Sequence, residues 1–291
     1  MSSEAPGFIG PYRLLNAIHT GHTVQIWQAY HDGKHERFVI KTPLERFRRS
    51  REAIAELRWE DSVGRKFRHK RIIQIHEFGI DRGTPFLAME WFAAPNMKQR
   101  ILQGVEPILH LVPRIIEQAA EGLGYLHHLG WVHRDVKPTN FMVSDQGEVK
   151  LIDFALTRKA KRGLSKLLPS RTKVQGTRSY IAPEQIRGGA PDVRSDIYSF
   201  GCTVFELLAG KPPFTGVSAD ELLSKHLKAS PPTLEAVNKN ITSEFAQLIR
   251  RSMAKDPSAR PQSLSDFVLE LRMNRVFKRT PRPPEEATAE S

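Results

Sequence analysis

The chain has 291 residues, of which 40% are hydrophobic and 26% charged, so it can bury an ordinary core and exceeds the usual length of one simple domain. Its single cysteine excludes an internal disulfide framework, and no stretch approaches the roughly 18 apolar residues that a membrane-spanning helix needs. The net charge of +12 at pH 7 suits an acidic partner without identifying one. We therefore expect a two-lobed globular protein of the cytoplasm, with no membrane span in this chain. Because the most basic run, residues 158–173, lacks aromatic residues that would stack on bases, we expect no nucleic-acid partner.

The first ninety residues predict a small sheet with one helix. Short β-prone runs alternate with turn signals at Asp32-Gly33 and Asp81-Arg82-Gly83. The predicted strands cover residues 12–17, 24–30, 38–42, 72–78 and 85–91. A long charged stretch, residues 50–66, is typical of a single helix.

Beyond Pro95 the pattern predicts mainly helices. Apolar residues recur every three or four positions from Val112 to Leu126, which indicates one buried face of a helix. Further helices are predicted over residues 195–209, 219–228, 243–254 and 264–273, and a hairpin over residues 141–143 and 149–152. Ser218 and Ser263 begin capping signatures at two of these helices. From Lys278 the chain has almost nothing to bury, so we expect the tail to be disordered.

Several polar residues lie between apolar neighbours in the stretch Gly130–Val143. Asp135 and Asn140 belong to it, and the hairpin that follows returns the chain so that Asp153 can approach them. Two carboxylates and an amide oxygen suit Mg²⁺, which completes its shell with water and substrate phosphates. Lys137 could place a compact positive charge beside a phosphate. Each residue alone could equally be an ordinary polar group of a loop, but the combination predicts phosphoryl transfer.

The stretch His133-Arg-Asp-Val-Lys-Pro-Thr-Asn140 resembles the catalytic loop of the eukaryotic-type serine/threonine protein kinases, a family that includes bacterial members. Further motifs follow in the order of that family over residues 12 to about 275, nearly the whole chain. They are Phe38-Val-Ile-Lys41, the segment from Asp153 to Ala182-Pro-Glu184, Ser195-Asp-Ile-Tyr-Ser-Phe-Gly201 and Lys255-Asp-Pro-Ser-Ala-Arg-Pro261. In the family, the residues that correspond to Arg260 and Glu184 pair, and the one that corresponds to Asp196 braces the catalytic loop.

The resemblance implies a two-lobed α+β protein kinase fold. Its small N-lobe is rich in β-strands and has one main helix, and its larger C-lobe is mainly helical. The expected division is an N-terminal extension (1–11), an N-lobe (12–92), a C-lobe (93–275) and a disordered tail (276–291).

The resemblance also implies the reaction, which is transfer of the γ-phosphate of ATP to serine and threonine hydroxyls of proteins. Asp135 would orient the substrate hydroxyl or accept its proton, and Lys137 after it follows the serine/threonine pattern. Asn140 and Asp153 would hold Mg²⁺.

Nucleotide binding is implied for a second group of residues. Lys41 would contact the α and β phosphates, and family spacing selects Glu60, over Glu52 or Glu56, to hold Lys41 in place. The expected nucleotide-binding residues are Ile18, Gly21, Ile26, Val39, Lys41, Glu90, Phe92 and Met142.

The chain departs from the family pattern at the phosphate loop, where only the central Gly21 of three glycines remains. Side chains at His19 and Val24 should impede close approach to phosphates, which would weaken nucleotide binding or slow turnover. Ala155 stands where the family has glycine after the metal-binding aspartate, at a cost on the order of 1 kcal/mol if that position needs a positive φ and near zero otherwise. Val39, where alanine is usual, should narrow the adenine pocket.

Arg134, next to the catalytic aspartate, implies regulation by a phosphate on the activation segment. The candidate phosphorylation sites are Ser165, Ser170 and Thr172, whereas Thr177 is expected to support Asp135 and Lys137. We expect autophosphorylation through a transient dimer. The alternative is a loop with no switch.

Two other functions compete with an active protein kinase. The eroded phosphate loop and Ala155 would suit a pseudokinase that acts as a binding or scaffolding module. A small-molecule phosphotransferase of similar fold is the other alternative, and Lys137, the complete Ala182-Pro-Glu184 motif and Asp196 argue against it. We favour activity because the five residues with a direct role in chemistry are all present, namely Lys41, Asp135, Lys137, Asn140 and Asp153.

Overall fold

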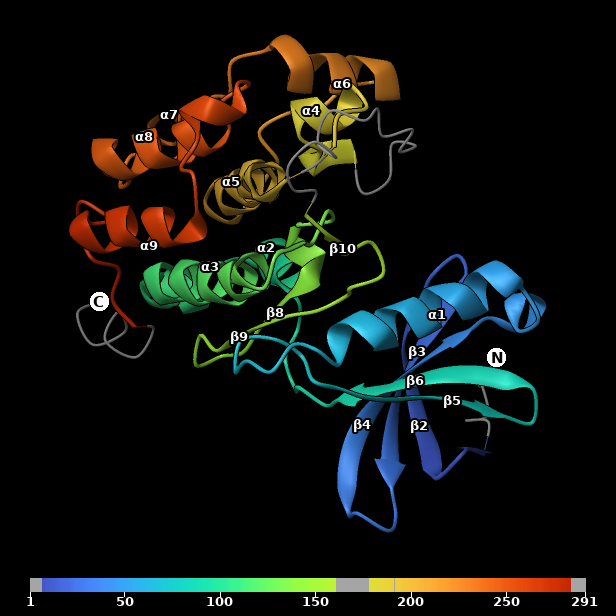
Figure 1. Cartoon of the computed structure of the whole chain (residues 1–291). Coiled ribbons are helices and arrows are strands. Elements are labelled where there is room, and N and C mark those ends of the chain that lie inside the picture. Colours follow the sequence, from blue (N-terminus) through green and yellow to red (C-terminus); the bar gives the residue numbers. More distant parts are fainter. Residues whose placement is uncertain (1–6, 161–177, 191, 284–291) are drawn as a thin grey trace. The chain divides into compact units, whose positions relative to one another are not determined.

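The computed structural model describes residues 7–160, 178–190 and 192–283, which form two compact units (Figure 1). The first unit contains the chain up to Ala93 together with Asp153–Ala155, and the second contains Ala94–Ile152 and the chain from Leu156 onward. The first is a β-sheet with one main helix and the second is mainly helical, as the expected α+β fold requires.

The first unit is built on an antiparallel sheet of six strands in the order β1-β2-β3-β4-β6-β5. Its strands are β1 (Phe8–Ile9), β2 (Tyr12–Thr20), β3 (Val24–His31), β4 (Glu36–Pro43), β5 (Ile75–Asp81) and β6 (Thr84–Glu90). A 3₁₀ turn, η1 (Glu45–Phe47), precedes helix α1 (Arg51–Gly64), which starts at a side-chain cap from Ser50. The expected helix over residues 50–66 therefore exists with slightly narrower bounds.

Two expectations for this unit were wrong at their boundaries. The N-terminal extension expected over residues 1–11 is shorter, because Phe8–Ile9 pair with β2 and Ile9 is buried. The strand expected from residue 72 begins only at Ile75. Ile72 and Ile73 are apolar because they are buried in the preceding loop, and the sequence pattern alone did not distinguish that burial from a strand.

The hairpin between β5 and β6 follows the expected turn signal. Asp81 pairs directly with Thr84, so Arg82 and Gly83 form a two-residue loop, and both have positive φ (46° and 78°). This is the backbone that a tight hairpin turn requires, and glycine adopts it without a steric penalty.

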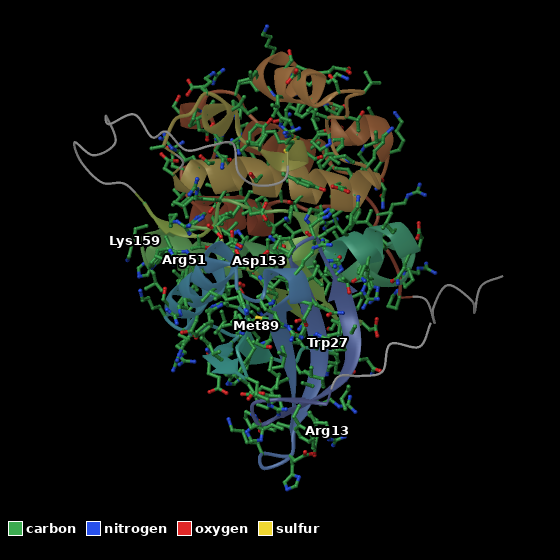
Figure 2. All side chains as sticks on the ribbon, turned by 90° about the vertical axis from the view of Figure 1, so that its right-hand side faces the viewer. Arg13, Trp27, Arg51, Met89, Asp153 and Lys159 are labelled. Carbon is green, nitrogen blue, oxygen red and sulfur yellow. The ribbon has the colours of Figure 1, made fainter. Side chains whose placement is uncertain are left out.

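The strand register determines which side chains share a face of the sheet. Ile26 lies opposite Lys41, and Val39 is two residues from Lys41, so these three side chains project from the same face. Side chains that point to the opposite face of the sheet build a compact apolar core. Its residues are Ile9, Tyr12, Leu14, Trp27, Ala29, Phe38, Ile40, Phe86 and Ala88. Arg13, ion-paired with Asp32 at 3.0 Å, lies at the end of the sheet remote from Asp153 (Figure 2).

The second unit is organised around helix α5 (Val193–Ala209), in which every residue from Ser195 to Leu208 is buried. Helices α2, α3, α7 and α8 pack against it. The helices of this unit are α2 (Met97–Gln103), α3 (Val112–His128), α4 (Pro183–Ile186), α6 (Ala219–Lys228), α7 (Leu234–Val237), α8 (Ser243–Ser252) and α9 (Leu264–Met273), together with the 3₁₀ turns η2 (Glu106–Leu111), η3 (Pro138–Asn140), η5 (Arg178–Tyr180) and η6 (Pro257–Ala259). Its short strands pair as β7 (Trp131–Val132) with β10 (Arg158–Lys159) and β8 (Phe141–Val143) with β9 (Val149–Leu151).

The expected helices over residues 219–228 and 264–273 have these bounds in the structure, and both start at the expected serine caps. The Ser218 and Ser263 side chains accept from the backbone amides of Glu221 and Asp266. Helices α2, α4 and α7 were not predicted, because segments of four to seven residues carry too few turns for a periodic signal.

The second unit includes residues beyond the boundary expected at residue 276. Val276 and Phe277 are buried, and Phe277 forms a β-bridge with Ile241, so the start of the expected tail belongs to the folded unit. Residues 284–291 lie outside the described part. Within the described residues, no helix combines the length and the apolarity that crossing a bilayer would require.

Candidate active site

A buried cluster of charges in the first unit joins β4, α1 and the segment 153–155. The Lys41 ammonium lies 2.7 Å from Oε2 of Glu60 and 3.6 Å from Oδ1 of Asp153. Glu60 is only 1% exposed, and its second oxygen, Oε1, accepts from the backbone amide of Phe154. Of the three glutamates considered on α1, the structure therefore pairs Glu60 with Lys41.

Electrostatics keep this lysine charged. Burial of Lys41 opposes the charge, but the nearby carboxylates of Asp153 and Glu60 outweigh it and raise the Lys41 pKa above its ordinary value. A lysine held in this way presents a fixed point charge suited to a phosphate.

The catalytic-loop motif lies in the second unit, between β7 and η3. The Lys137 ammonium is 2.6 Å from Oδ2 of Asp135, and both side chains are mostly buried. The Asn140 side-chain amide donates to the Asp135 carbonyl at 2.8 Å, which turns the amide oxygen of Asn140 away from that bond. The three predicted residues of this loop therefore converge on one point.

Asp196, at the start of α5, holds the backbone of this loop through its side chain. Its two carboxylate oxygens accept from the amides of His133 (2.7 Å) and Arg134 (2.8 Å). Arg134 has a φ of 72°, a conformation that costs a non-glycine residue about 1 kcal/mol, and the bond to Asp196 offsets that cost. Sequence reasoning missed a third partner, Nε2 of His127, which lies 2.9 Å from Asp196. It sits on the last turn of α3, where a histidine resembles an ordinary helix-end residue.

The predicted nucleotide-binding residues are divided between the two units. In the first unit, Ile26 and Val39 are half-buried on the face that carries Lys41. Ile18 is half exposed at an irregularity of β2, and Gly21 closes the hairpin tip by donating to the Val24 carbonyl at 2.9 Å.

At the end of β6, the backbone amide of Glu90 donates to the Gln74 carbonyl at 2.8 Å, so this amide does not remain for a nucleotide. Phe92 follows two residues later in the same unit and is half-buried. Met142, on β8, belongs to the second unit and forms a bridge with Asn96.

Ala155 has an ordinary backbone in this structure. The described non-glycine residues with positive φ are His35, Arg82, Arg134 and Asp153, so position 155 does not need a glycine here. Alanine therefore costs close to nothing at this position in the observed conformation.

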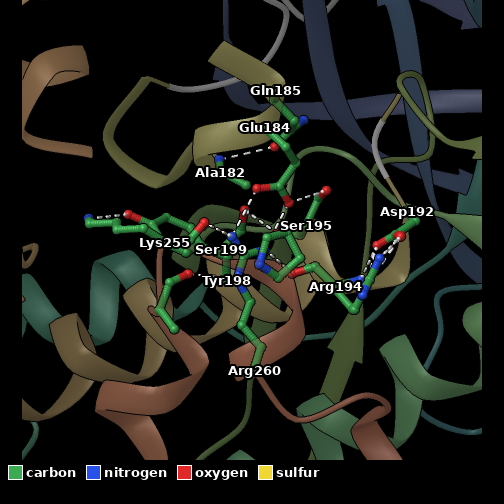
Figure 3. Close-up of polar contacts among 12 residues, drawn as sticks. Ala182, Glu184, Gln185, Asp192, Arg194, Ser195, Tyr198, Ser199, Lys255 and Arg260 are labelled. Carbon is green, nitrogen blue, oxygen red and sulfur yellow. Dashed lines mark hydrogen bonds and ion pairs between the residues drawn. The ribbon is translucent and has the colours of Figure 1, made fainter. Parts of the chain in front are cut away.

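A second ion pair fixes the Ala182-Pro-Glu184 motif within the second unit (Figure 3). The Arg260 guanidinium, whose side chain is fully buried, bonds both carboxylate oxygens of Glu184 at 2.7 and 2.9 Å. Ser195 donates to the same carboxylate at 2.6 Å, and the Arg260 guanidinium lies over the Tyr198 ring at 4.9 Å. The pairing expected from the resemblance is present. The candidate phosphorylation sites Ser165, Ser170 and Thr172, with Thr177, lie outside the described residues.

Each unit offers an oxygen donor of the kind that Mg²⁺ prefers. Asp153 offers a carboxylate that is about one-third exposed, and Asn140 offers an amide oxygen. Over the described ranges, no group of three or more His, Cys, Asp or Glu side chains could hold a metal alone. An ion that prefers one or two protein oxygens and completes its shell with phosphates and water is compatible with this set.

The first unit is a sheet with one charged helix. The second unit is helical and contains a loop in which Asp135 lies beside Lys137, with its backbone held by Asp196, as well as the buried ion pair of Arg260 and Glu184. These features define a protein-kinase type of phosphotransferase domain. Comparison with known proteins agrees, since the protein kinase domain model matches residues 12–269. The chain therefore belongs to the protein kinase family.

Its relatives include bacterial serine/threonine-protein kinases. It is 30% identical to PknL of Mycobacterium tuberculosis over 249 residues, which is 86% of this chain and 62% of PknL. It is 31% identical to PknA of the same species over 279 residues, which is 94% of this chain and 63% of PknA. It is also 28% identical to a probable serine/threonine-protein kinase of Clostridium acetobutylicum over 260 residues, which is 89% of this chain and 39% of that protein. The chain thus spans less than two thirds of the length of these relatives.

Proposed function

We propose that this chain is an active serine/threonine protein kinase that transfers the γ-phosphate of ATP to protein hydroxyls. The observation that carries the proposal is the loop at Asp135, whose carboxylate lies 2.6 Å from the Lys137 ammonium. The backbone of the same loop is held by Asp196. Preorganised charges of this kind provide most of the catalysis in phosphoryl transfer.

Asp135 would act on the substrate hydroxyl. In the reaction, the hydroxyl oxygen forms a bond to the γ-phosphorus while the bond from that phosphorus to the bridging oxygen of ADP breaks, and the hydroxyl proton passes to the Asp135 carboxylate. Lys137, beside Asp135, would stabilise the charge on the transferred phosphoryl group.

The first unit would bind the nucleotide. Lys41, held by Glu60, would contact the α and β phosphates, while Ile26 and Val39 would contact adenine from one side. Asp153 and Asn140 would hold Mg²⁺, which when bound neutralises phosphate charge. The remaining proposed contacts are Ile18, Gly21, the backbone of Phe92, the carbonyl of Glu90, and Met142.

Autophosphorylation of the activation segment, by a transient dimer, is part of the proposal. Burial, with the nearby Arg158, lowers the pKa of Arg134, and its Nε has no hydrogen-bond partner among the described residues. Because Arg134 and Arg158 are both cations in partly buried surroundings, they would bind a phosphate group of the segment. That phosphate would neutralise them and order the segment through charge-assisted hydrogen bonds.

The test is transfer of labelled γ-phosphate from ATP with Mg²⁺ to the protein itself and to a basic protein. Wild type should transfer label, and Asp135→Asn should lose at least about a hundredfold in rate, as expected when a positioned base is removed. Asp145→Asn is the matched control, because Asp145 is an exposed carboxylate of the β8–β9 turn, paired with Arg100 at 2.6 Å. It should transfer label at the wild-type rate.

Equal transfer by Asp135→Asn and wild type would refute the role of Asp135. No transfer by folded wild-type protein would refute the activity and leave a binding module. We favour turnover because Lys41, Asp135, Lys137, Asn140 and Asp153 are all retained, and the geometry described above engages each of them.

A further inference from the structure

A cavity of about 450 Å³ lies in the second unit, lined by the ends of α6 and α8 and by the loop that follows α8. Its lining includes the fully buried Met253 and the small apolar residues Ala229, Pro231 and Ala254. The volume is at the small end of known ligand pockets and suits one or two side chains.

Four cationic residues line this cavity, and none of the described residues that line it is acidic. They are Lys228, Arg250, Arg251 and Lys255. Arg251 pairs with Glu270, whereas Lys228 and Arg250 are exposed and form no ion pair within residues 7–160, 178–190 and 192–283. The cavity therefore combines an apolar lining with a positively charged rim.

Lys255 adds a partly desolvated charge. Its ammonium lies 4.3 Å from the centre of the Phe214 ring and 3.3 Å from the Tyr198 hydroxyl, and no carboxylate of the described residues pairs with it. Burial, together with the nearby Arg260, lowers its pKa to about 8 from the ordinary 10.5. An anion nearby would favour the charged form of this lysine.

The helix dipole explains part of this arrangement. Cations near the last turn of a helix are stabilised by its carbonyl ends, and both α6 and α8 end at this cavity. That effect is local to each helix and does not explain why the cations of two helices and a loop gather around one apolar cavity. Like charges brought together repel, and an anionic ligand would offset the repulsion.

We propose that this cavity docks an acidic segment of a partner protein. An apolar side chain of that segment would enter the cavity, and flanking aspartate, glutamate or phosphoserine groups would pair with Lys228 and Arg250. None of the described residues that line the cavity is aromatic, so nucleic-acid bases would find no ring there on which to stack, and this favours a peptide. The site does not involve Asp135 or Lys41, so the inference does not depend on the proposed catalytic activity.

The experiment measures fluorescence polarisation of a labelled Glu-Glu-Leu-Glu-Glu peptide, up to about 1 mM protein. The double variant Lys228→Glu with Arg250→Glu should weaken binding at least about tenfold. The control is Lys211→Glu with Lys239→Glu, which changes the charge by the same amount at two exposed lysines of the same unit. It should weaken binding less than about threefold, because these charges act only over a screened distance. A peptide with serine in place of leucine should bind more weakly to wild type, and circular dichroism checks that both variants fold.

Three results would overturn the proposal. Equal weakening by the two double variants would indicate non-specific attraction to a basic protein. Undetectable binding by wild type would exclude an acidic peptide ligand of this kind. Stronger binding of a short single-stranded oligonucleotide or of phosphatidylserine vesicles, measured at the same salt concentration and sensitive to the same double variant, would assign the cavity to another class of partner.

Discussion

Arg260→Ala should destabilise the second unit strongly. The fully buried guanidinium bonds both oxygens of Glu184 and also the carbonyls of Ala254 and Arg194. Removal of one partner from a buried ion pair costs about 3–5 kcal/mol, because the other charge stays buried without compensation. For a unit of this size, each kcal/mol corresponds to about 2–4 °C in Tm, so we expect a decrease of at least about 6 °C by calorimetry.

The control is Arg272→Ala. Arg272 is also ion-paired, with Glu117 and Glu121, but its side chain is 59% exposed. Exposed pairs are worth about 0–1 kcal/mol, so Tm should change by only a few degrees. If Arg260→Ala lowered Tm no more than Arg272→Ala, the reasoning that burial makes the Glu184 pair important would be wrong.

Three further predictions concern pH, the segment after Asp153 and the phosphate loop. Burial, with Lys255 nearby, lowers the pKa of His226 to about 4 from its ordinary 6.5, so the unfolded state takes up the proton first as pH falls. As the pH is lowered from 6.5 to 4, the free energy of unfolding of wild type should therefore decrease. This decrease should exceed that of His226→Gln by up to about 3 kcal/mol, as measured by urea denaturation. Ala155→Gly should not stabilise the protein and should cost at most about 1 kcal/mol, because position 155 lacks a positive φ; a gain in unfolding free energy would contradict that backbone assignment. His19→Gly with Val24→Gly should lower KM for ATP about threefold in the transfer assay by letting backbone amides approach phosphates, and an unchanged or higher KM would show that these side chains themselves contribute to binding.

The predictions from sequence succeeded where the signal was local. The helices over 219–228 and 264–273 were placed with these bounds, because serine caps and apolar periodicity depend only on neighbouring residues. The turn at Arg82-Gly83 follows from the same kind of local rule. Local reasoning was wrong where burial came from elsewhere in the fold, as at Ile72 and at Phe277.

The order and spacing of polar motifs were enough to predict a kinase fold and to name Asp135, Lys137, Asn140 and Asp153, since each chemical role requires particular functional groups. Family spacing favoured Glu60 among three glutamates of one helix, and tertiary packing pairs it with Lys41 by burying it 2.7 Å from the ammonium. Packing also decided that Ala155 is unstrained, that His127 supports Asp196, and that cations from two helices and a loop surround one cavity. The reason is physical, because contacts between residues far apart in the chain depend on how whole elements pack, and no short stretch of sequence encodes that packing.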